Sequence, residues 1–180
     1  MIKILKQIYS TGKKRYLLRK AFNTRYPTCT YEEGLIIKGP FKNMILSDNV
    51  KFQSNVMIHL GGMEWCQNKG SLRLGENSII SPNVVIYAAG PGGVVIGKNF
   101  DCGPGVQIFA SHTNIKDRSK YVFGQVEIGN NVTLFANVVV SPGVKIGDNA
   151  VVLASSVVNK NIQPNTVYGG VPARLIKHLT

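Results

Sequence analysis

Apolar residues recur at every sixth position in the C-terminal half of the chain, from residue 128 to residue 158. A second set of apolar residues follows four places after the first members. The first set is Ile128, Leu134, Val140, Ile146, Val152 and Val158, and the second is Val132, Val138, Val144 and Ala150. An α-helix would repeat at three and four residues, and a simple strand would alternate without the Pro-Gly and Gly-Asp-Asn turns found here. The pattern therefore predicts a parallel β-helix, in which each six-residue unit is a short strand and a turn.

The same register continues upstream, interrupted by insertions, and predicts about five coils of three strands each. The further core positions are Leu46, Phe52, Ile58, Leu74, Ile80, Ile86, Ile96, Cys102 and Ile108. Their companion positions hold mostly small side chains, at Val50, Val56, Ser78, Val84, Val106, Val132 and Ser156. We expect large and small side chains to stack in columns inside a triangular prism.

Three insertions interrupt the register, and each follows the third strand of its coil. The step between core positions lengthens from six to sixteen residues after Ile58, to ten after Ile86 and to twenty after Ile108. Because coils stack at about 4.8 Å, the spacing of paired strands, all three insertions should leave from one edge of the prism. Loops gathered on a rigid scaffold commonly carry function, so we expect the functional site at that edge.

The chain is expected to fold as one all-β domain with a short segment at each end. Its 180 residues, 44% of them apolar, are enough to bury a core. The expected segments are a basic helical N-terminal segment at 1–34, the β-helix at 35–163 with insertion loops near 59–73, 87–95 and 109–127, and a tail at 164–180. Pro172 is suited to open a short final helix from Ala173 to Leu179, since proline is tolerated in a first turn.

The net charge of +12 belongs mainly to the N-terminal segment. Eight of the 21 basic residues and none of the nine acidic residues lie within residues 1–25, so the remainder carries +4 (12 − 8). We expect residues 2–22 to form one or two short helices, broken near Gly12, that pack on one end of the β-helix or on a neighbouring subunit and cap an open strand edge. A peripheral contact of residues 1–25 with anionic lipid is the functional alternative. A nucleic-acid partner is not expected, because no recognition motif accompanies the charge.

The three cysteines, Cys29, Cys66 and Cys102, are odd in number and lack the spacing of metal ligands. They are expected to be free thiols, as in a reducing compartment, and Cys102 falls on a core position. No apolar run approaches the roughly 20 residues that cross a membrane, and the first 20 residues lack the features of a signal peptide. The protein is therefore expected in the cytoplasm. The basic N-terminal segment would favour a location at the inner face of the membrane.

Several motifs carry a resemblance to a known family over about residues 46–178. They are Val95-Ile96-Gly97-Lys98-Asn99, Gly103-Pro104-Gly105-Val106-Gln107-Ile108, Ser111-His112, and the run from Glu127 to Gly169-Gly170-Val171-Pro172-Ala173-Arg174. With them the chain resembles the left-handed β-helix acyltransferases of the hexapeptide-repeat family. The similarity is greatest to maltose and galactoside acetyltransferases and to O-acetyltransferases of bacterial cell-surface polysaccharides. The resemblance implies a left-handed β-helix and a homotrimer with active sites between subunits.

The resemblance implies direct acetyl transfer from acetyl-CoA to a hydroxyl of a sugar or glycan, without an acyl-enzyme. His112 lies at the start of the longest insertion, and an imidazole can take the proton of a hydroxyl that attacks a thioester. His112 is therefore the expected general base, and no metal is expected. The acids near it in sequence are Asp101, Asp117 and Glu127, and the sequence does not choose which of them orients the ring.

Other site residues follow from position in the repeat, as the resemblance implies them. Ser81 stands where relatives often carry an acceptor-binding asparagine, Asn83 follows it, and His59 and Asp101 are the other residues expected on the acceptor side. The residues expected along acetyl-CoA are Ala136, Ala154, Asn159, Lys160, Arg174 and Lys177. The basic ones suit phosphates. Phe135 replaces a smaller residue of many relatives and is expected to reshape the channel for the pantetheine arm.

Three alternatives stay open from the sequence. An amino sugar or another small molecule could replace the sugar hydroxyl as acceptor. A non-catalytic scaffold could be built from the same repeat. A γ-type carbonic anhydrase would hold zinc with three histidines, but His59, His112 and His178 are not spaced as a cluster.

Overall fold

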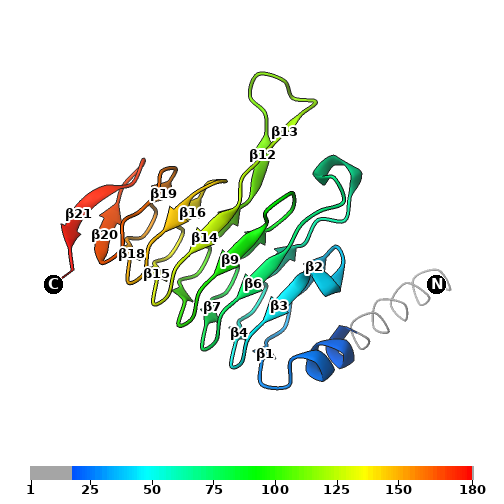
Figure 1. The fold of residues 1–180 in the computed structure, drawn as a ribbon. Helices are drawn as coiled ribbons and strands as arrows, with labels where there is room; N and C mark the ends of the chain where they lie inside the picture. The colour runs from blue at the N-terminus through cyan, green and yellow to red at the C-terminus, as the bar shows by residue number, and fades with distance from the viewer. Residues whose placement is uncertain (1–17, 180) are drawn as a thin grey trace, which may run out of the picture.

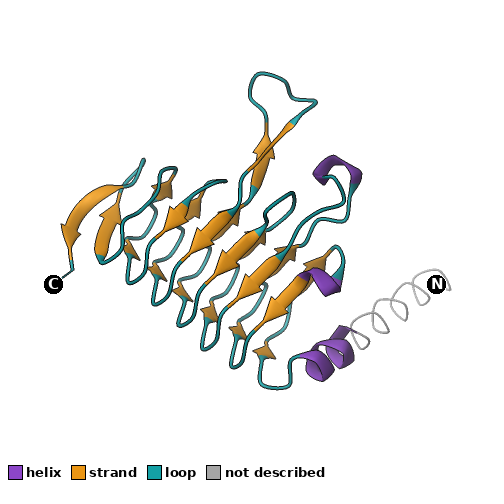
Figure 2. Ribbon diagram, in the orientation of Figure 1, coloured by secondary structure: helices purple, strands orange, loops and turns teal. Residues whose placement is uncertain are grey.

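The computed structural model of the chain describes residues 18–179, and most of them form a three-sided parallel β-helix (Figures 1 and 2). Sheet A contains, in order, β1 (Thr30–Tyr31), β4 (Lys51–Phe52), β7 (Ile79–Ile80), β10 (Asp101–Cys102), β15 (Thr133–Leu134), β18 (Val151–Val152), β20 (Thr166–Gly169) and β21 (Arg174–His178). Sheet B contains β2 (Ile36–Lys38), β5 (Met57–His59), β8 (Val85–Tyr87), β11 (Gln107–Phe109), β16 (Val139–Val140) and β19 (Val157–Val158). Sheet C contains β3 (Met44–Leu46), β6 (Leu72–Leu74), β9 (Val94–Ile96), β14 (Val126–Ile128) and β17 (Lys145–Ile146).

The six-residue register is confirmed by the strand pairing. In sheet C, for example, Leu74 pairs with Ile96, which pairs with Ile128 in the next coil. The prism also extends beyond the predicted limits of 35 and 163. Tyr31 of β1 pairs with Phe52, and β20 pairs with β18, because strands at both ends find an open edge to continue.

The predicted core lies inside the prism. The fifteen predicted core positions are buried, and their companions at Val50, Val56, Ser78, Val84, Val106, Val132 and Ser156 are fully buried. Ser78 and Ser156 are accommodated because each hydroxyl donates to a backbone carbonyl of its own turn. Cys102 is buried as predicted, and burial raises the pKa of its thiol to about 12, so it behaves as a small apolar residue. All three cysteines are free.

Two of the three corners are turned mainly by asparagines in the left-handed backbone region. The corner from sheet C to sheet A, here called the C–A corner, uses Asn49, Asn77, Asn99, Asn131, Asn149 and Asn165, all with φ between 55° and 60°. Asparagine reaches this conformation more easily than other side chains. The side chains also connect the coils: Asn99 donates to Asn131 at 2.8 Å, Asn131 to Asn149 at 2.9 Å, and Asn149 to Asn165 at 2.8 Å. The corner from sheet A to sheet B, the A–B corner, uses Asn55, Asn83, Gly105, Asn137 and Ser155 in the same way.

The insertions leave from the third corner, between sheets B and C, as predicted. The first, between β5 and β6, contains the 3-10 helix η2 (Glu64–Cys66); η1 (Phe41–Asn43) occupies the same corner one coil earlier. The longest insertion forms an antiparallel hairpin of β12 (Ser111–Thr113) and β13 (Tyr121–Phe123), which projects from the prism (Figure 1). This edge, the B–C corner, is therefore where the chain departs most from the repeat.

The C-terminal helix predicted from Ala173 to Leu179 is wrong. Residues Arg174–His178 form β21, which pairs antiparallel with β20. Residues 174–178 do not alternate between apolar and polar side chains clearly enough to predict a strand. However, β20 has an unpaired edge whose backbone groups need hydrogen-bond partners. Tertiary pairing therefore overrides the helix-opening tendency of Pro172.

At the other end, residues 18–25 form a helix that covers the first coil. Phe22 is fully buried, with its ring centroid 4.8 Å from Tyr31 and 6.3 Å from Phe52. This part of the N-terminal segment is a cap. The predicted break near Gly12 and the basic residues before residue 18, for which contact with anionic lipid is the alternative, lie outside the described residues. No helix within residues 18–179 is long and apolar enough to cross a membrane.

The asparagine column predicts a specific stability difference between two substitutions. Asn131→Ala removes two ladder bonds and forces alanine into the left-handed region, so it should lower the free energy of unfolding by about 2 kcal/mol. Asn131→Gly loses the same bonds, but glycine adopts the left-handed conformation at low cost. Its free energy of unfolding should therefore fall by about half as much. Urea unfolding of both variants measures this. Equal losses would show that the backbone requirement does not operate at this corner.

Candidate functional site

His112 lies on the hairpin that projects from the B–C corner. In β12 it pairs with Val122 of β13, while Ser111 pairs with Phe123 and Thr113 with Tyr121. Directly paired residues point to the same face of a hairpin and alternate residues to opposite faces. His112 and Val122 therefore occupy one face, and the pairs on either side of them occupy the other.

The ring of His112 is oriented by a backbone carbonyl. Its Nδ1 lies 2.8 Å from the carbonyl oxygen of Thr113. A carbonyl oxygen accepts only, so Nδ1 must carry the hydrogen and Nε2 keeps its lone pair in the neutral ring. His112 is exposed. The arrangement presents one unprotonated nitrogen outward, which is what a general base requires.

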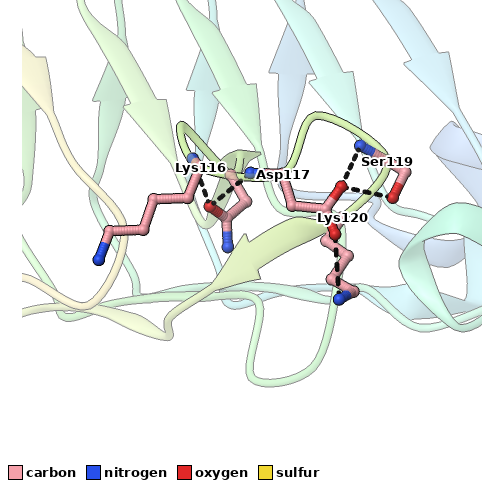
Figure 3. A network of polar contacts seen from close by, with 5 residues as sticks. Lys116, Asp117, Ser119 and Lys120 are labelled. Atoms are coloured by element: carbon pink, nitrogen blue, oxygen red, sulfur yellow. Dashed lines mark hydrogen bonds and ion pairs between the residues drawn. The ribbon is translucent and has the colours of Figure 1, made fainter.

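None of the three acids considered from the sequence orients His112. Asp117 accepts hydrogen bonds from the Ser119 hydroxyl at 2.6 Å and backbone at 3.1 Å, and it pairs with Lys120 at 3.0 Å (Figure 3). The hydrogen bonds from Ser119 and then Lys120 lower the pKa of this carboxyl. Glu127 pairs with Lys145 at 3.0 Å on sheet C, and Asp101 is exposed on sheet A.

The tip of the hairpin is ordered by its own polar groups. The side-chain oxygen of Asn114 accepts from the backbone N–H of Lys116 at 2.8 Å and of Asp117 at 3.3 Å (Figure 3). These bonds and those of Asp117 close the turn without help from the prism. Asp117 is thus a turn residue.

His59 lies on the same B–C edge but is buried, with 4% of its surface exposed. Its Nδ1 accepts from the backbone N–H of Gly61 at 3.2 Å, which places the hydrogen on Nε2. Its ring lies 4.6 Å from that of Tyr87 and 6.0 Å from that of Trp65. Burial, and then the charge of Lys38, lower the pKa of His59. His59 is therefore a neutral, well-packed ring rather than a surface histidine.

The remaining acceptor candidates lie elsewhere on the chain. Ser81 and Asn83 form the A–B corner between β7 and β8, where Asn83 has a φ of 59° and its backbone N–H donates to Ser54 at 3.0 Å. The left-handed conformation of Asn83 explains why an asparagine occupies this position. Within one chain, the width of sheet B separates this corner from the B–C corner that carries His112.

The candidates for the donor side fall into two groups. Ala136 and Ala154 stand at the A–B corner in successive coils, and the backbone N–H of Ser155 donates to Ala136 at 2.9 Å. Beside them, Phe135 and Leu153 expose 45% and 36% of their surfaces. The basic group is more dispersed, with Lys160 and Asn159 following β19, and Arg174 and Lys177 exposed on β21.

A surface hollow of about 630 Å³ contains none of the residues expected to bind the acceptor or acetyl-CoA. It lies over sheet C and is lined in part by Val95, Glu127 and Lys145. No group of three His, Cys, Asp or Glu side chains within residues 18–179 is arranged to hold a metal ion. The described part of a single chain therefore shows an exposed, oriented imidazole and an exposed apolar corner, but not one enclosed site.

A cluster of aromatic residues beside the hairpin was not predicted. It contains Trp65, Tyr87, Phe109, Tyr121 and Phe123, with His59 at one end. Three of these residues lie in the insertions, and Tyr87 and Phe109 end the strands that precede them. Their concentration around one edge was visible in the sequence once the coils were in register.

The chain is similar to known acyltransferases. Residues 125–160 match the model of the bacterial transferase hexapeptide (six repeats) family. A galactoside O-acetyltransferase of Escherichia coli K12 is 30% identical over 168 residues, covering 88% of this chain and 74% of the relative. A solved hexapeptide-repeat acetyltransferase of Vibrio cholerae, complexed with acetyl-CoA, has a TM-score of 0.65 at 24% identity, covering 94% of this chain and 78% of that one. AntD, an N-acyltransferase of Bacillus cereus in complex with dTDP and 3-hydroxybutyryl-CoA, has a TM-score of 0.74 at 18% identity, covering 91% and 88%.

The lowered pKa of His59 predicts a pH dependence of stability. In the unfolded chain His59 binds a proton near pH 6.5, whereas the folded ring resists it. Stability should therefore be unaffected above pH 6.5 and should fall below it, by at most about 1.4 kcal/mol per pH unit for one proton. His59→Gln keeps an acceptor for Gly61 and cannot titrate in this range. Urea unfolding at pH 7.5 and pH 5 should show a smaller pH effect in the variant, and identical pH effects would contradict the assignment.

Proposed function

Because the chain belongs to the hexapeptide-repeat family of bacterial acyltransferases, we propose that it transfers an acetyl group from acetyl-CoA directly to a hydroxyl of a sugar or glycan. A precursor of a cell-surface polysaccharide is the acceptor class that we favour. The observation that carries the proposal is the geometry of His112, whose Nδ1 is bound to the Thr113 carbonyl at 2.8 Å. This fixes Nε2 as the basic nitrogen.

The proposed reaction needs one base and no covalent enzyme intermediate. Nε2 of His112 takes the proton of the acceptor hydroxyl as the hydroxyl oxygen forms a bond to the thioester carbonyl carbon. The tetrahedral intermediate then collapses, the carbon–sulfur bond breaks, and the CoA sulfur receives the proton from the imidazolium. The products are the acetyl ester and CoA, and His112 returns to its neutral form.

The A–B corner of the late coils supports binding of acetyl-CoA. Ala136 and Ala154 leave the backbone accessible there, and Phe135 and Leu153 add exposed apolar surface suited to the pantetheine arm. Lys160, Arg174 and Lys177 are exposed cations for the phosphates of the nucleotide. Asn159, next to Lys160, is proposed to contact the same part of the cofactor.

A homotrimer is the proposed assembly, because one chain separates the parts of the site. Ser81, Asn83 and the alanine turns lie at the A–B corner, across sheet B from His112. A neighbouring chain whose A–B corner faces the insertion edge would bring them together. In that arrangement His112 acts on acetyl-CoA and acceptor held partly by the adjacent subunit, and Asp101, Ser81 and Asn83 are the proposed acceptor contacts. His59, which was expected among them, is too buried to contact an acceptor.

The activity is tested by incubating the protein with acetyl-CoA and a panel of sugars and amino sugars. Free CoA should appear only with an acceptor, and His112→Ala should lower kcat by roughly 10²-fold or more. Ile45→Ala is the control, since this residue is exposed on sheet C, away from the hairpin. An unchanged kcat would remove His112 as base. Turnover of amino sugars alone would favour N-acetylation, and failure to bind CoA would favour a non-catalytic scaffold.

The cofactor side is tested at the two cations of β21. Arg174→Gln and Lys177→Gln together should raise the KM for acetyl-CoA about 10-fold or more, because charge-assisted hydrogen bonds to phosphate are worth about 1.5–3 kcal/mol each. The KM for the acceptor should stay within twofold. Lys98→Gln, an exposed cation at the C–A corner, is the matched control. If the double variant and Lys98→Gln changed the KM for acetyl-CoA equally, the phosphates would bind at another surface.

A further inference from the structure

The hairpin that carries His112 forms no hydrogen bond or ion pair with the rest of the described chain. The polar contacts of residues 111–123 are internal to the hairpin, such as the backbone bond from Asn114 to Lys120 at 2.9 Å. Isolated two-stranded hairpins are only marginally stable in water. Backbone bonds tie only the base of this hairpin to the prism, where Gly124 donates to Ala110 and Ala110 donates to Tyr87, both at 2.9 Å. The rest of the hairpin must be held by side-chain packing.

Aromatic packing supplies that connection. The ring of Tyr121 on β13 lies 4.7 Å from that of Trp65 on η2. Trp65 in turn stacks on Tyr87 of sheet B, with centroids 6.1 Å apart and planes 22° apart. Aromatic pairs at such distances contribute about 0.5–1.5 kcal/mol beyond the area that they bury.

A second contact fixes the base of the hairpin. Phe123 packs directly over Gly90, where a Cβ would collide with the ring. Gly90 also has a φ of 106°, a region that suits glycine. The two contacts together, one near the tip and one near the base, resist rotation of the hairpin about its own axis.

Trp65 is itself firmly placed on the prism. Its neighbour Cys66 is fully buried, with Sγ donating to the carbonyl of Met63 at 3.0 Å. The indole N–H lies 3.2 Å from the sulfur of Met63. Through its contact with Tyr121, Trp65 therefore links the first insertion to the hairpin, which is the third insertion.

We propose that Trp65 and Tyr121 are positioning residues that set the location of His112. The inference rests on the proposed function, since it assigns to this aromatic pair the task of holding the base against the acceptor and the thioester. A displacement of about 1 Å at a reacting group can cost up to about 10²-fold in rate. Two rings in contact are thus enough to control turnover without touching substrate.

The strand register argues against direct contact of these rings with the reacting atoms. Tyr121 pairs with Thr113 and Phe123 with Ser111, so both rings project from the face of the hairpin opposite to His112. Ser111 is buried on the same face as the rings, and its hydroxyl has no partner in the described residues. The packed face supports the hairpin, and the other face carries the chemistry.

The first test does not depend on activity. Lys116, Arg118 and Lys120 are exposed at the hairpin tip and are trypsin sites. Trp65→Ala should speed cleavage within the hairpin about 10-fold, and Tyr121→Ala should do the same, because either change frees the hairpin. Trp65→Phe, which keeps a ring, should cleave at close to the wild-type rate, as should Ile45→Ala. Unchanged cleavage in both alanine variants would overturn the proposal.

The second test asks whether Trp65 acts through His112. Trp65→Ala should lower kcat about 10-fold with both KM values within twofold, and Trp65→Phe should restore most of it. In a His112→Ala background, Trp65→Ala should cause no further loss, since the base that it positions is already absent. A further tenfold loss in that background, or a raised KM for the sugar with unchanged kcat, would overturn the positioning role. If the wild-type protein transfers no acetyl group at all, the proposed function fails, and the cleavage result still decides whether the rings hold the hairpin.

Discussion

Every strand of the prism is short, so the chain must turn a corner after each one, and this requirement governs the rest of the structure. Turns at the C–A and A–B corners use left-handed backbone, which asparagine and glycine adopt at low cost. At the C–A corner the asparagines also bond from coil to coil. The turn length at two edges of this left-handed β-helix is thereby fixed, since an insertion there would disturb the coils on both sides.

The third corner is the one that carries the insertions. Its insertions leave between sheets B and C, where loops of different length are closed by glycines and by their own contacts. Because successive coils are paired residue by residue, the loops are brought side by side although Trp65 and Tyr121 are 56 positions apart (121 − 65) in sequence. Trp65 can therefore reach Tyr121 at 4.7 Å. The regular strands set the position of the loops, and the loops bring His112 and the aromatic cluster to one edge.

The fold was largely predictable because the inward side chains report directly on the coil geometry. The period identified the core positions at every sixth residue, their small companions and the edge of the insertions. It failed at residues 174–178, where the partner edge of β20 decides the conformation and no local signal competes with it. In the candidate site, the place of His112 on the insertion edge could be predicted because it follows the core residue Ile108 by four positions in the sequence. The carbonyl that orients it could not be predicted, because every residue has one, and the aromatic contacts depend on loop conformations that have no repeat.

The choice of a carbonyl partner for His112 is consistent with how the nearby charges are used. Asp117 closes the hairpin turn and Glu127 pairs across coils with Lys145, so both carboxylates already have partners. A backbone carbonyl fixes the tautomer as a carboxylate would, but it brings no net charge to the ring. It is also held by the same strand as the histidine, at the adjacent residue. The tautomer therefore depends on the local hairpin backbone, whereas the place of the ring in space depends on how the hairpin as a whole is packed against the prism.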